Sequence, residues 1–239
     1  MPRIVATIEA RTGSTRLPNK VLLETLSRPL LALMVDRLRR ARYLDEIVIA
    51  TTTATRDDAI VELGAREKVA VFRGSEDDVL GRVVGAATAH RADVCVLLTG
   101  DSPLIDPLIV DQHIVTFLSA RPHVDYVTNC EVASYPVGLA VQVMTLKTLA
   151  ESALLTAGQN PGPFREHVGW YVRRHPERYR RLDVVAPPGL SNPHYRLTLD
   201  TAEDYRRIRE VFETLYPQDP AFGTAALLEL GRAKGWIDS

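Results

Sequence analysis

The chain has 239 residues, of which 46% are hydrophobic and 25% are charged, and its formal net charge is −1. These values are typical of globular proteins and argue against disorder or a coiled coil. The near-zero charge gives no electrostatic reason to expect nucleic-acid binding. No apolar run approaches the roughly 20 residues of a membrane helix, so no membrane partner is expected. With two cysteines, Cys95 and Cys130, and no signal-peptide pattern, we expect a cytoplasmic protein.

Strand and helix patterns alternate through the first half of the chain. The β-branched and continuously apolar runs predict strands at residues 3–8, 46–52, 69–72, 93–99 and 124–128. Helical spacing of apolar residues predicts helices at 29–38, 57–68, 76–90 and 106–120. Four such repeats indicate an α/β fold with a doubly wound, mostly parallel sheet.

The alternation changes after about residue 130. Strands at 138–144, 181–185 and 195–199 suggest a mixed C-terminal part of the sheet, and helices are predicted at 164–175, 201–215 and 222–234. No linker separates independent domains, so residues 1–239 are expected to form one domain. Residues 130–195 are a candidate subregion for dimerisation or for binding an acceptor, and we expect a homodimer.

The loop at residues 10–20 follows the first predicted strand and gathers positive charge. Gly13 allows the backbone to approach a ligand closely, while Arg11, Arg16 and Lys20 can contact phosphate oxygens. The glycine spacing fits neither a Walker loop nor a dinucleotide fingerprint. An ordinary polar turn is the alternative, but three cations in ten residues at a strand end favour a phosphate-binding loop.

Two acidic residues also follow predicted strands. Asp101 is a candidate magnesium ligand, whereas Asp106 before Pro107 is interpreted as a helix N-cap. For Asp200, spacing alone leaves a metal ligand and an N-cap equally supported. Because ligands bind beyond the carboxyl ends of parallel strands, we expect Asp101 and Asp200 to meet there. Two carboxylates that close repel each other unless a proton or a cation lies between them.

The order of these motifs resembles the acylneuraminate cytidylyltransferase family, and most of all its branch of spore coat polysaccharide biosynthesis protein F. The resemblance covers nearly the whole chain. Its motifs are residues 10–22, 50–53, 72–80, 100–107, 165–167 and 197–201. It implies a Rossmann-like nucleotidyltransferase fold of the glycosyltransferase-A type, CTP as co-substrate and Mg²⁺ as cofactor.

The resemblance also implies roles for individual residues. It makes Lys20, Arg16 and Asp101 catalytic and favours Asp101 with Asp200 as the metal ligands. Acceptor-binding candidates are Gln142, Arg165 and His167. The implied triphosphate-binding residues are Arg11, Ser14, Arg16 and Lys20, and the other nucleotide-binding candidates are Ala10, Gly13, Thr52, Arg73, Ser75 and Gly100. The segment at residues 73–78 could face a base or ribose, or it could merely cap a helix.

The chain departs from this branch where the acceptor would bind. A usual Gly-Leu-Asp-x-Glu pattern is replaced by Gly138-Leu-Ala-Val-Gln142, which removes two carboxylates. Leu97 stands where an arginine is common, and Ser102 where a cysteine is often found. Fewer carboxylates repel an anionic acceptor less. A phosphonate or phosphate acceptor is therefore an alternative to a sugar acid.

The predicted reaction is transfer of CMP from CTP to such an acceptor, with release of pyrophosphate and with catalysis by positioning and charge neutralisation. A glycosyltransferase ranks lower, because no suitable Asp-x-Asp metal motif is found. A catalytically silent nucleotide-binding protein is a further alternative, given the changes at residues 140–142.

Overall fold

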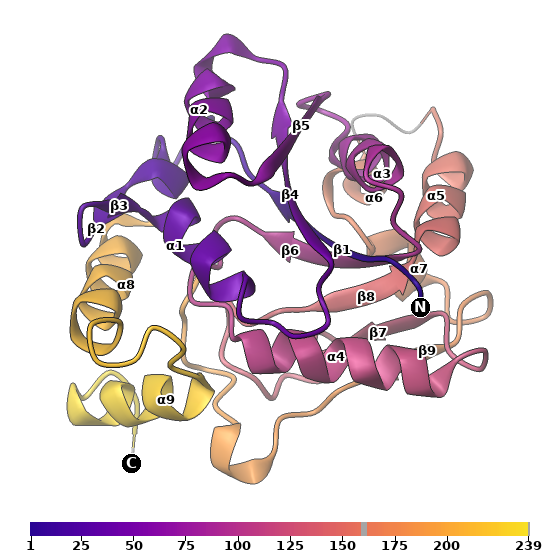
Figure 1. Cartoon of the computed structure of the whole chain (residues 1–239). Helices are drawn as coiled ribbons and strands as arrows, with labels where there is room; N and C mark the ends of the chain where they lie inside the picture. Colours follow the sequence, from indigo (N-terminus) through magenta and orange to yellow (C-terminus); the bar gives the residue numbers. More distant parts are fainter. Residues whose placement is uncertain (159–161, 239) are drawn as a thin grey trace.

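The computed structural model describes residues 1–158 and 162–238. A seven-stranded sheet runs through the molecule between two layers of helices (Figure 1), in the strand order β5-β4-β1-β6-β8-β7-β9. The strands of this sheet are β1 (Ile4–Glu9), β4 (Glu46–Thr52), β5 (Ala70–Gly74), β6 (Val94–Thr99), β7 (Tyr126–Thr128), β8 (Gln142–Thr145) and β9 (Arg181–Asp183). A separate small hairpin is formed by β2 (Glu24–Thr25) and β3 (Arg28–Pro29).

The sheet is parallel in its first half and mixed in its second. Strands β5, β4, β1 and β6 are parallel neighbours, whereas β8 is antiparallel to both β6 and β7. The chain builds outward from β1 to β4 and β5, then returns to place β6 on the other side of β1. The predicted α/β fold with a mixed C-terminal part is confirmed, and the reversal beside β1 creates a crevice at the carboxyl ends of β1 and β6.

Each face of the sheet carries its own hydrophobic core. Along β1, Ile4, Ala6 and Ile8 enter one core while Val5 enters the other, which explains why residues 4–8 are all buried. The first face is covered by α1 (Leu30–Leu38), α2 (Asp58–Glu67), α4 (Pro107–Ala120), α8 (Ala202–Leu215) and α9 (Thr224–Ala233). The second is covered by α3 (Val79–Ala89), α5 (Leu146–Leu155) and α7 (Trp170–Arg174).

Two predicted elements differ in the structure. The helix expected at residues 164–175 is two short helices, α6 (Pro163–Glu166) and α7, because Gly169 between them has a φ of +80°. The strand expected at 195–199 is an extended segment with one isolated bridge, between Val137 and Arg196. Its alternating apolar residues are buried, but its neighbours are loops rather than a sheet edge, as the bond from the Leu199 N–H to the Asp101 carbonyl shows.

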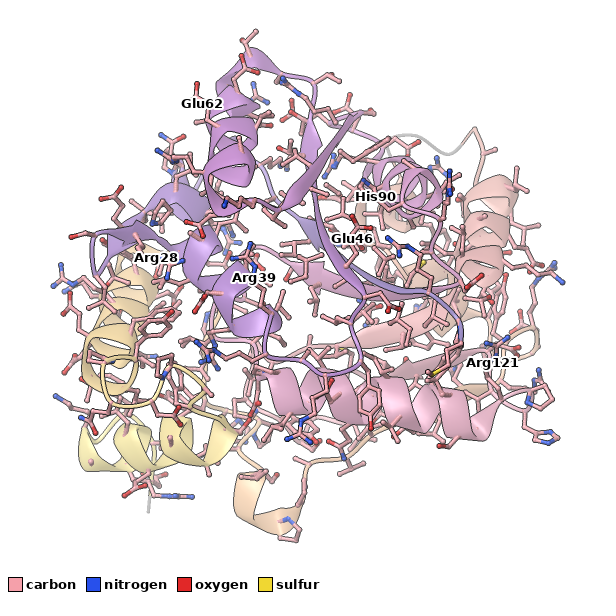
Figure 2. All side chains as sticks on the ribbon, viewed as in Figure 1. Arg28, Arg39, Glu46, Glu62, His90 and Arg121 are labelled. Atoms are coloured by element: carbon pink, nitrogen blue, oxygen red, sulfur yellow. The ribbon has the colours of Figure 1, made fainter. Side chains whose placement is uncertain are left out.

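Polar contacts of Glu46 join the amino-terminal edge of the sheet to its neighbours. Glu46 at the start of β4 contacts Arg3 at 2.8 Å and the ring of His90 at 3.0 Å, and Glu46 and His90 lie side by side in Figure 2. The crevice beside β1 lies at the opposite edge, where the strands have their carboxyl ends. Within the described residues, no helix is long and apolar enough to cross a membrane.

Candidate active site

A cleft of about 470 Å³ opens at the carboxyl ends of β1 and β6. Three segments that are far apart in the sequence meet around it. They are the loop at residues 10–20, which we call the opening loop, the loop after β6 and the start of α8. The side chains and backbone that line it belong to Glu9, Ala10, Arg11, Gly13, Ser14, Thr15, Arg16, Lys20, Val21, Val79, Arg82, Thr99, Gly100, Asp101, Glu166, His167 and Asp200.

The opening loop is held in shape by a buried carboxylate from a neighbouring element. Asp57, just before α2, accepts hydrogen bonds from the Thr12 N–H at 2.7 Å and from the Thr12 hydroxyl at 2.6 Å. Asn19 then adopts a left-handed conformation, with φ of 56°, and Lys20 begins a short 3-10 helix. The sequence prediction did not include Asp57. Its charge is stabilised here, because these bonds and Arg56 outweigh burial and lower the pKa of Asp57.

The loop after β6 packs directly against the end of β1. The Gly100 N–H donates to the Glu9 carbonyl at 2.8 Å, and a Cβ at Gly100 would lie 2.9 Å from that oxygen. Only glycine fits this close approach, and it directs the next residue, Asp101, into the cleft. Asp106 has the N-cap role that the sequence indicates, since its side chain accepts from the Leu108 N–H at 2.9 Å.

Asp200 is not the N-cap of the helix that follows it. Thr201 caps α8, and Thr201 and Asp204 form a reciprocal capping box. This removes the helix-capping alternative for Asp200 and leaves its carboxylate free to act in the cleft.

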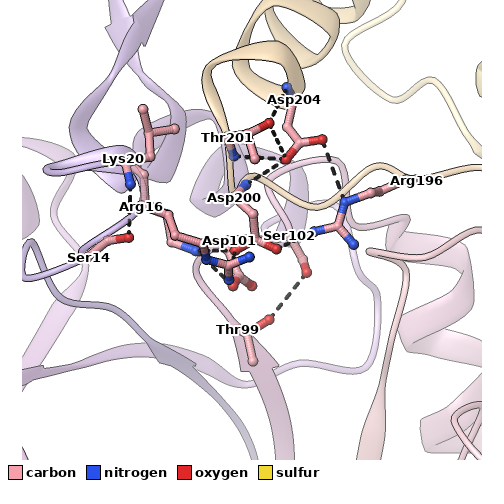
Figure 3. A network of polar contacts seen from close by, with 11 residues as sticks. Ser14, Arg16, Lys20, Thr99, Asp101, Ser102, Arg196, Asp200, Thr201 and Asp204 are labelled. Carbon is pink, nitrogen blue, oxygen red and sulfur yellow. Dashed lines mark hydrogen bonds and ion pairs between the residues drawn. The ribbon is translucent and has the colours of Figure 1, made fainter.

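One ammonium group lies between the two carboxylates of the cleft (Figure 3). Lys20 Nζ is 3.0 Å from Asp101 Oδ2 and 3.1 Å from Asp200 Oδ1. Arg16 adds a second contact to Asp200 Oδ1, at 2.9 Å. The sequence argument required a proton or a cation between Asp101 and Asp200, and in the structure the ammonium of Lys20 lies between them.

Arg196 is a residue of this network that the sequence did not reveal. Its guanidinium contacts Asp200 Oδ2 and lies 3.6 Å from Asp204 Oδ1, so it connects Asp200 to the capping box of α8. Burial alone would raise the pKa of Asp200. The pKa is nevertheless lowered, because Lys20 donates a hydrogen bond to the carboxylate and because Lys20, Arg16 and Arg196 are positively charged. Asp200 is therefore ionised at neutral pH.

Glu9 and Arg82 are two further charged residues of the cleft lining that the sequence prediction missed. Burial raises the pKa of Glu9 to about 8, Arg82 opposes this rise and Asp101 adds to it. Arg82 is 3% exposed and its Nε has no hydrogen-bond partner among the described residues. A signal was present in the sequence, since Glu9 is a charged residue at the end of an otherwise apolar strand.

The cleft contains many of the predicted site residues. Ala10, Arg11, Gly13, Ser14, Arg16, Lys20, Gly100, Asp101, His167 and Asp200 all line it. His167 lines the cleft with Glu166 and makes an edge contact with Trp170, with ring centroids 5.2 Å apart.

Three predicted nucleotide contacts lie outside the cleft lining. Thr52 is fully buried and its hydroxyl donates to Asp57. Arg73 donates to the carbonyls of Thr52 and Ala54, both at 2.9 Å, and so ties β5 to the end of β4. Ser75 accepts from the Asp78 N–H at 3.1 Å and helps to start α3. In the structure these side chains have local structural partners instead.

Two predicted acceptor contacts are also engaged elsewhere. Arg165 is 9% exposed, pairs with Asp78 and donates to the Ala153 carbonyl at 2.8 Å, so it joins α6 to α3 and α5. Gln142 accepts from the Tyr126 hydroxyl at 2.6 Å. Sequence motifs single out such residues, but they do not show with which neighbour each side chain forms its hydrogen bond or ion pair.

Comparison with known proteins identifies the family. Residues 5–227 match the cytidylyltransferase family. The chain belongs to that family. It is 36% identical over 217 residues to the spore coat polysaccharide biosynthesis protein SpsF of Bacillus subtilis, covering 89% of this chain and 88% of that one. This cytidylyltransferase is therefore a CTP-dependent nucleotidyltransferase, as the resemblance implied.

Solved structures support the same assignment. A cytidylyltransferase from Leptospira borgpetersenii superposes with a TM-score of 0.90 at 30% identity, over 99% of this chain and 96% of that one. The CMP:2-keto-3-deoxy-manno-octonic acid synthetase, in complex with CTP, has a TM-score of 0.64 at 18% identity over 88% and 98% of the two chains. The second match supports the fold alone.

Proposed function

We propose that this cytidylyltransferase transfers CMP from CTP to the hydroxyl of an anionic acceptor, with a sugar acid as the first candidate, and releases pyrophosphate. The observation that carries the proposal is the convergence of Lys20, Asp101 and Asp200 at the switch point of the sheet. Cations from one loop and carboxylates from two others meet where an open α/β sheet binds its ligand.

The opening loop would bind the triphosphate. Arg11, Arg16 and Lys20 line the same side of the cleft, and Arg11 is held there by Glu76 at 3.2 Å. Such cations stabilise charge that develops on the leaving pyrophosphate. The loop therefore contributes to both binding and catalysis.

Asp101 and Asp200 would hold the divalent cation. Magnesium prefers one or two carboxylates together with phosphate oxygens, and these two carboxylates fit that preference. When bound, the ion would neutralise charge at the α-phosphate. Arg196 would keep Asp200 oriented, because it lies outside the cleft lining and is tied to Asp204.

The acceptor would enter from the wall formed by Glu166 and His167. Gln142 would act indirectly, since its side chain packs against Gly169, between α6 and α7. The neutral residues Ala140 and Gln142 favour a phosphonate or phosphate acceptor as the second candidate.

The test is pyrophosphate release from each of the four nucleoside triphosphates with Mg²⁺, against a panel of sugar acids and hydroxyphosphonates. We expect release only with CTP and with one acceptor class, and that class decides between the two candidates. The proposal would be refuted if neither acceptor class raised the rate of pyrophosphate release above that of CTP hydrolysis without acceptor.

A further inference from the structure

Lys20 occupies the point between two carboxylates where a bridging divalent cation would also be placed. Its Nζ lies 3.0 Å from Asp101 and 3.1 Å from Asp200, and the side chains of Lys20 and Asp200 are only 14% and 13% exposed. These are partly desolvated contacts, in which charge is screened less than on the surface.

The charge around Asp200 is already balanced without a metal ion. Asp200 Oδ1 accepts from Lys20 and Arg16, and Oδ2 accepts from Arg196. The two carboxylates thus face three cations. With Asp204 beside Arg196, three carboxylates offset the three cations, so a divalent cation that approached this cluster alone would meet no net negative charge.

The cations of the cluster differ in their freedom to move. Lys20 has a flexible four-carbon stem and lines the cleft, whereas Arg196 lies outside the lining and is connected to α8 through Asp204. A triphosphate in the cleft would offer Lys20 a more strongly charged partner than either aspartate. Lys20 can therefore change partner while Arg196 stays on Asp200.

We propose that Lys20 occupies the place of the divalent cation in the nucleotide-free enzyme and transfers to the triphosphate when nucleotide binds. Lys20 thereby suppresses metal binding in the absence of nucleotide and couples the arrival of the two ligands. Such coupling is reciprocal, so a metal ion that displaces Lys20 also improves nucleotide binding. This inference rests on the proposed function of Asp101 and Asp200 as metal ligands.

The experiment is a titration of the nucleotide-free enzyme with Mn²⁺, in which electron paramagnetic resonance reports free Mn²⁺. Lys20→Met removes the ammonium and keeps the length of the side chain. We expect it to bind Mn²⁺ at least about tenfold more tightly than the parent, because one charge-assisted contact changes an equilibrium by about this much. The same variant should bind CTP more weakly in the presence of metal.

Two control variants make the result specific. Arg40→Met removes a cation that pairs with Asp36 away from the cleft lining, so its Mn²⁺ affinity should equal that of the parent. Lys20→Met combined with Asp200→Asn should lose the gain. A variant that merely unfolds cannot bind Mn²⁺ more tightly at the same site, and a thermal melt of each variant verifies folding.

Equal or weaker Mn²⁺ binding by Lys20→Met would overturn the inference. That failure differs from failure of the proposed function. The Mn²⁺ titration needs no turnover, so tighter Mn²⁺ binding without CMP transfer would refute only the reaction. CMP transfer by the parent without tighter Mn²⁺ binding in Lys20→Met would refute only the role of Lys20 before nucleotide binds.

Discussion

Lys20 and Arg16 place two cations on the carboxylates of the cleft, in a position to bind a triphosphate. Lys20→Ala and Arg16→Ala should each weaken CTP binding by about 10- to 100-fold, since a hydrogen bond to a charged group contributes about 1.5–3 kcal/mol. Calorimetric titration with CTP and Mg²⁺ measures this. Parental affinity in both variants would disprove the phosphate-loop assignment.

The matched control is Arg40→Ala. Arg40 also pairs with an aspartate, Asp36, but lies on the surface after α1 and away from the cleft lining. It should leave CTP affinity unchanged. Exposed ion pairs contribute little to stability, so urea unfolding should separate Arg40→Ala and Arg16→Ala from the parent by less than about 1 kcal/mol.

Asp200→Asn tests the carboxylate that three cations share. The amide keeps the shape but loses the charge, so turnover and Mn²⁺ binding with CTP should fall by at least about tenfold. The helix should remain intact, because Thr201 is its cap. Relief of repulsion with Asp101 should not stabilise the nucleotide-free form, since Lys20 already lies between them. If the Asp200→Asn enzyme had parental activity, Asp200 would not be a metal ligand of this site.

Glu9 should make stability depend on pH. Burial raises the pKa of Glu9 from its ordinary value of 4.5 to about 8 in the folded chain, so only the folded state holds the proton between these two values. The free energy of unfolding therefore decreases as the pH rises from about 4.5 to about 8. Glu9→Gln cannot titrate. In urea unfolding without metal or nucleotide, its stability relative to the parent should rise across this window, and a constant difference would contradict the burial of Glu9.

At the level of elements, the break between α6 and α7 orients the wall of the cleft that carries His167. Gly169 there has a φ of +80°, and a Cβ on it would lie 2.2 Å from Gln142 Oε1. The glycine thus permits both the turn and the close contact with β8. A continuous helix over residues 164–175 would need a helical φ at this position.

Gly169→Ala should therefore destabilise the fold by about 2–3 kcal/mol, from left-handed strain and from the displaced hydrogen bond between Gln142 and Tyr126. Gly158→Ala is the matched control. Gly158 has a φ of +82°, but no atom of the described residues lies within 4 Å of the added Cβ, so this variant reports the strain alone. Equal losses of stability in the two variants, measured by urea unfolding, would show that the Gln142 contact has no energetic role.

At the level of the whole molecule, residues 130–195 expose an apolar surface. Val132 and Val185 are 51% and 52% exposed, and their segments are joined by the bond from the Val132 N–H to Asp183 at 2.9 Å. Exposed valines near β9, the last strand at this edge of the sheet, favour self-association through this subregion. We expect a homodimer that uses this surface.

Analytical ultracentrifugation at micromolar concentration tests the dimer. The parent should sediment as a dimer, and Val132→Glu combined with Val185→Glu should sediment as a monomer, because buried unpaired carboxylates oppose association. Leu108→Glu, on α4 and 68% exposed in the parent, should remain dimeric. A monomeric parent would end this hypothesis.

The sequence by itself determined the strands of the parallel half, the order of the motifs and the concentration of cations in residues 10–20. Apolar periodicity and glycine position are local properties, so β1, β4 and β6 and the opening loop could be predicted from neighbouring residues alone. The family resemblance extended this to the reaction class. The capping role of Asp106 also followed from a local pattern.

Only the tertiary structure decided which partner each polar side chain has. Lys20 lies between Asp101 and Asp200, and Arg165 joins helices instead of facing the cleft. The tertiary structure also decided that the segment at 195–199, expected as a strand, lies beside a loop and makes only one isolated bridge. Ion pairs and buried hydrogen bonds form between segments about 80 to 180 residues apart, and no local pattern in the chain specifies which of several similar charges will meet.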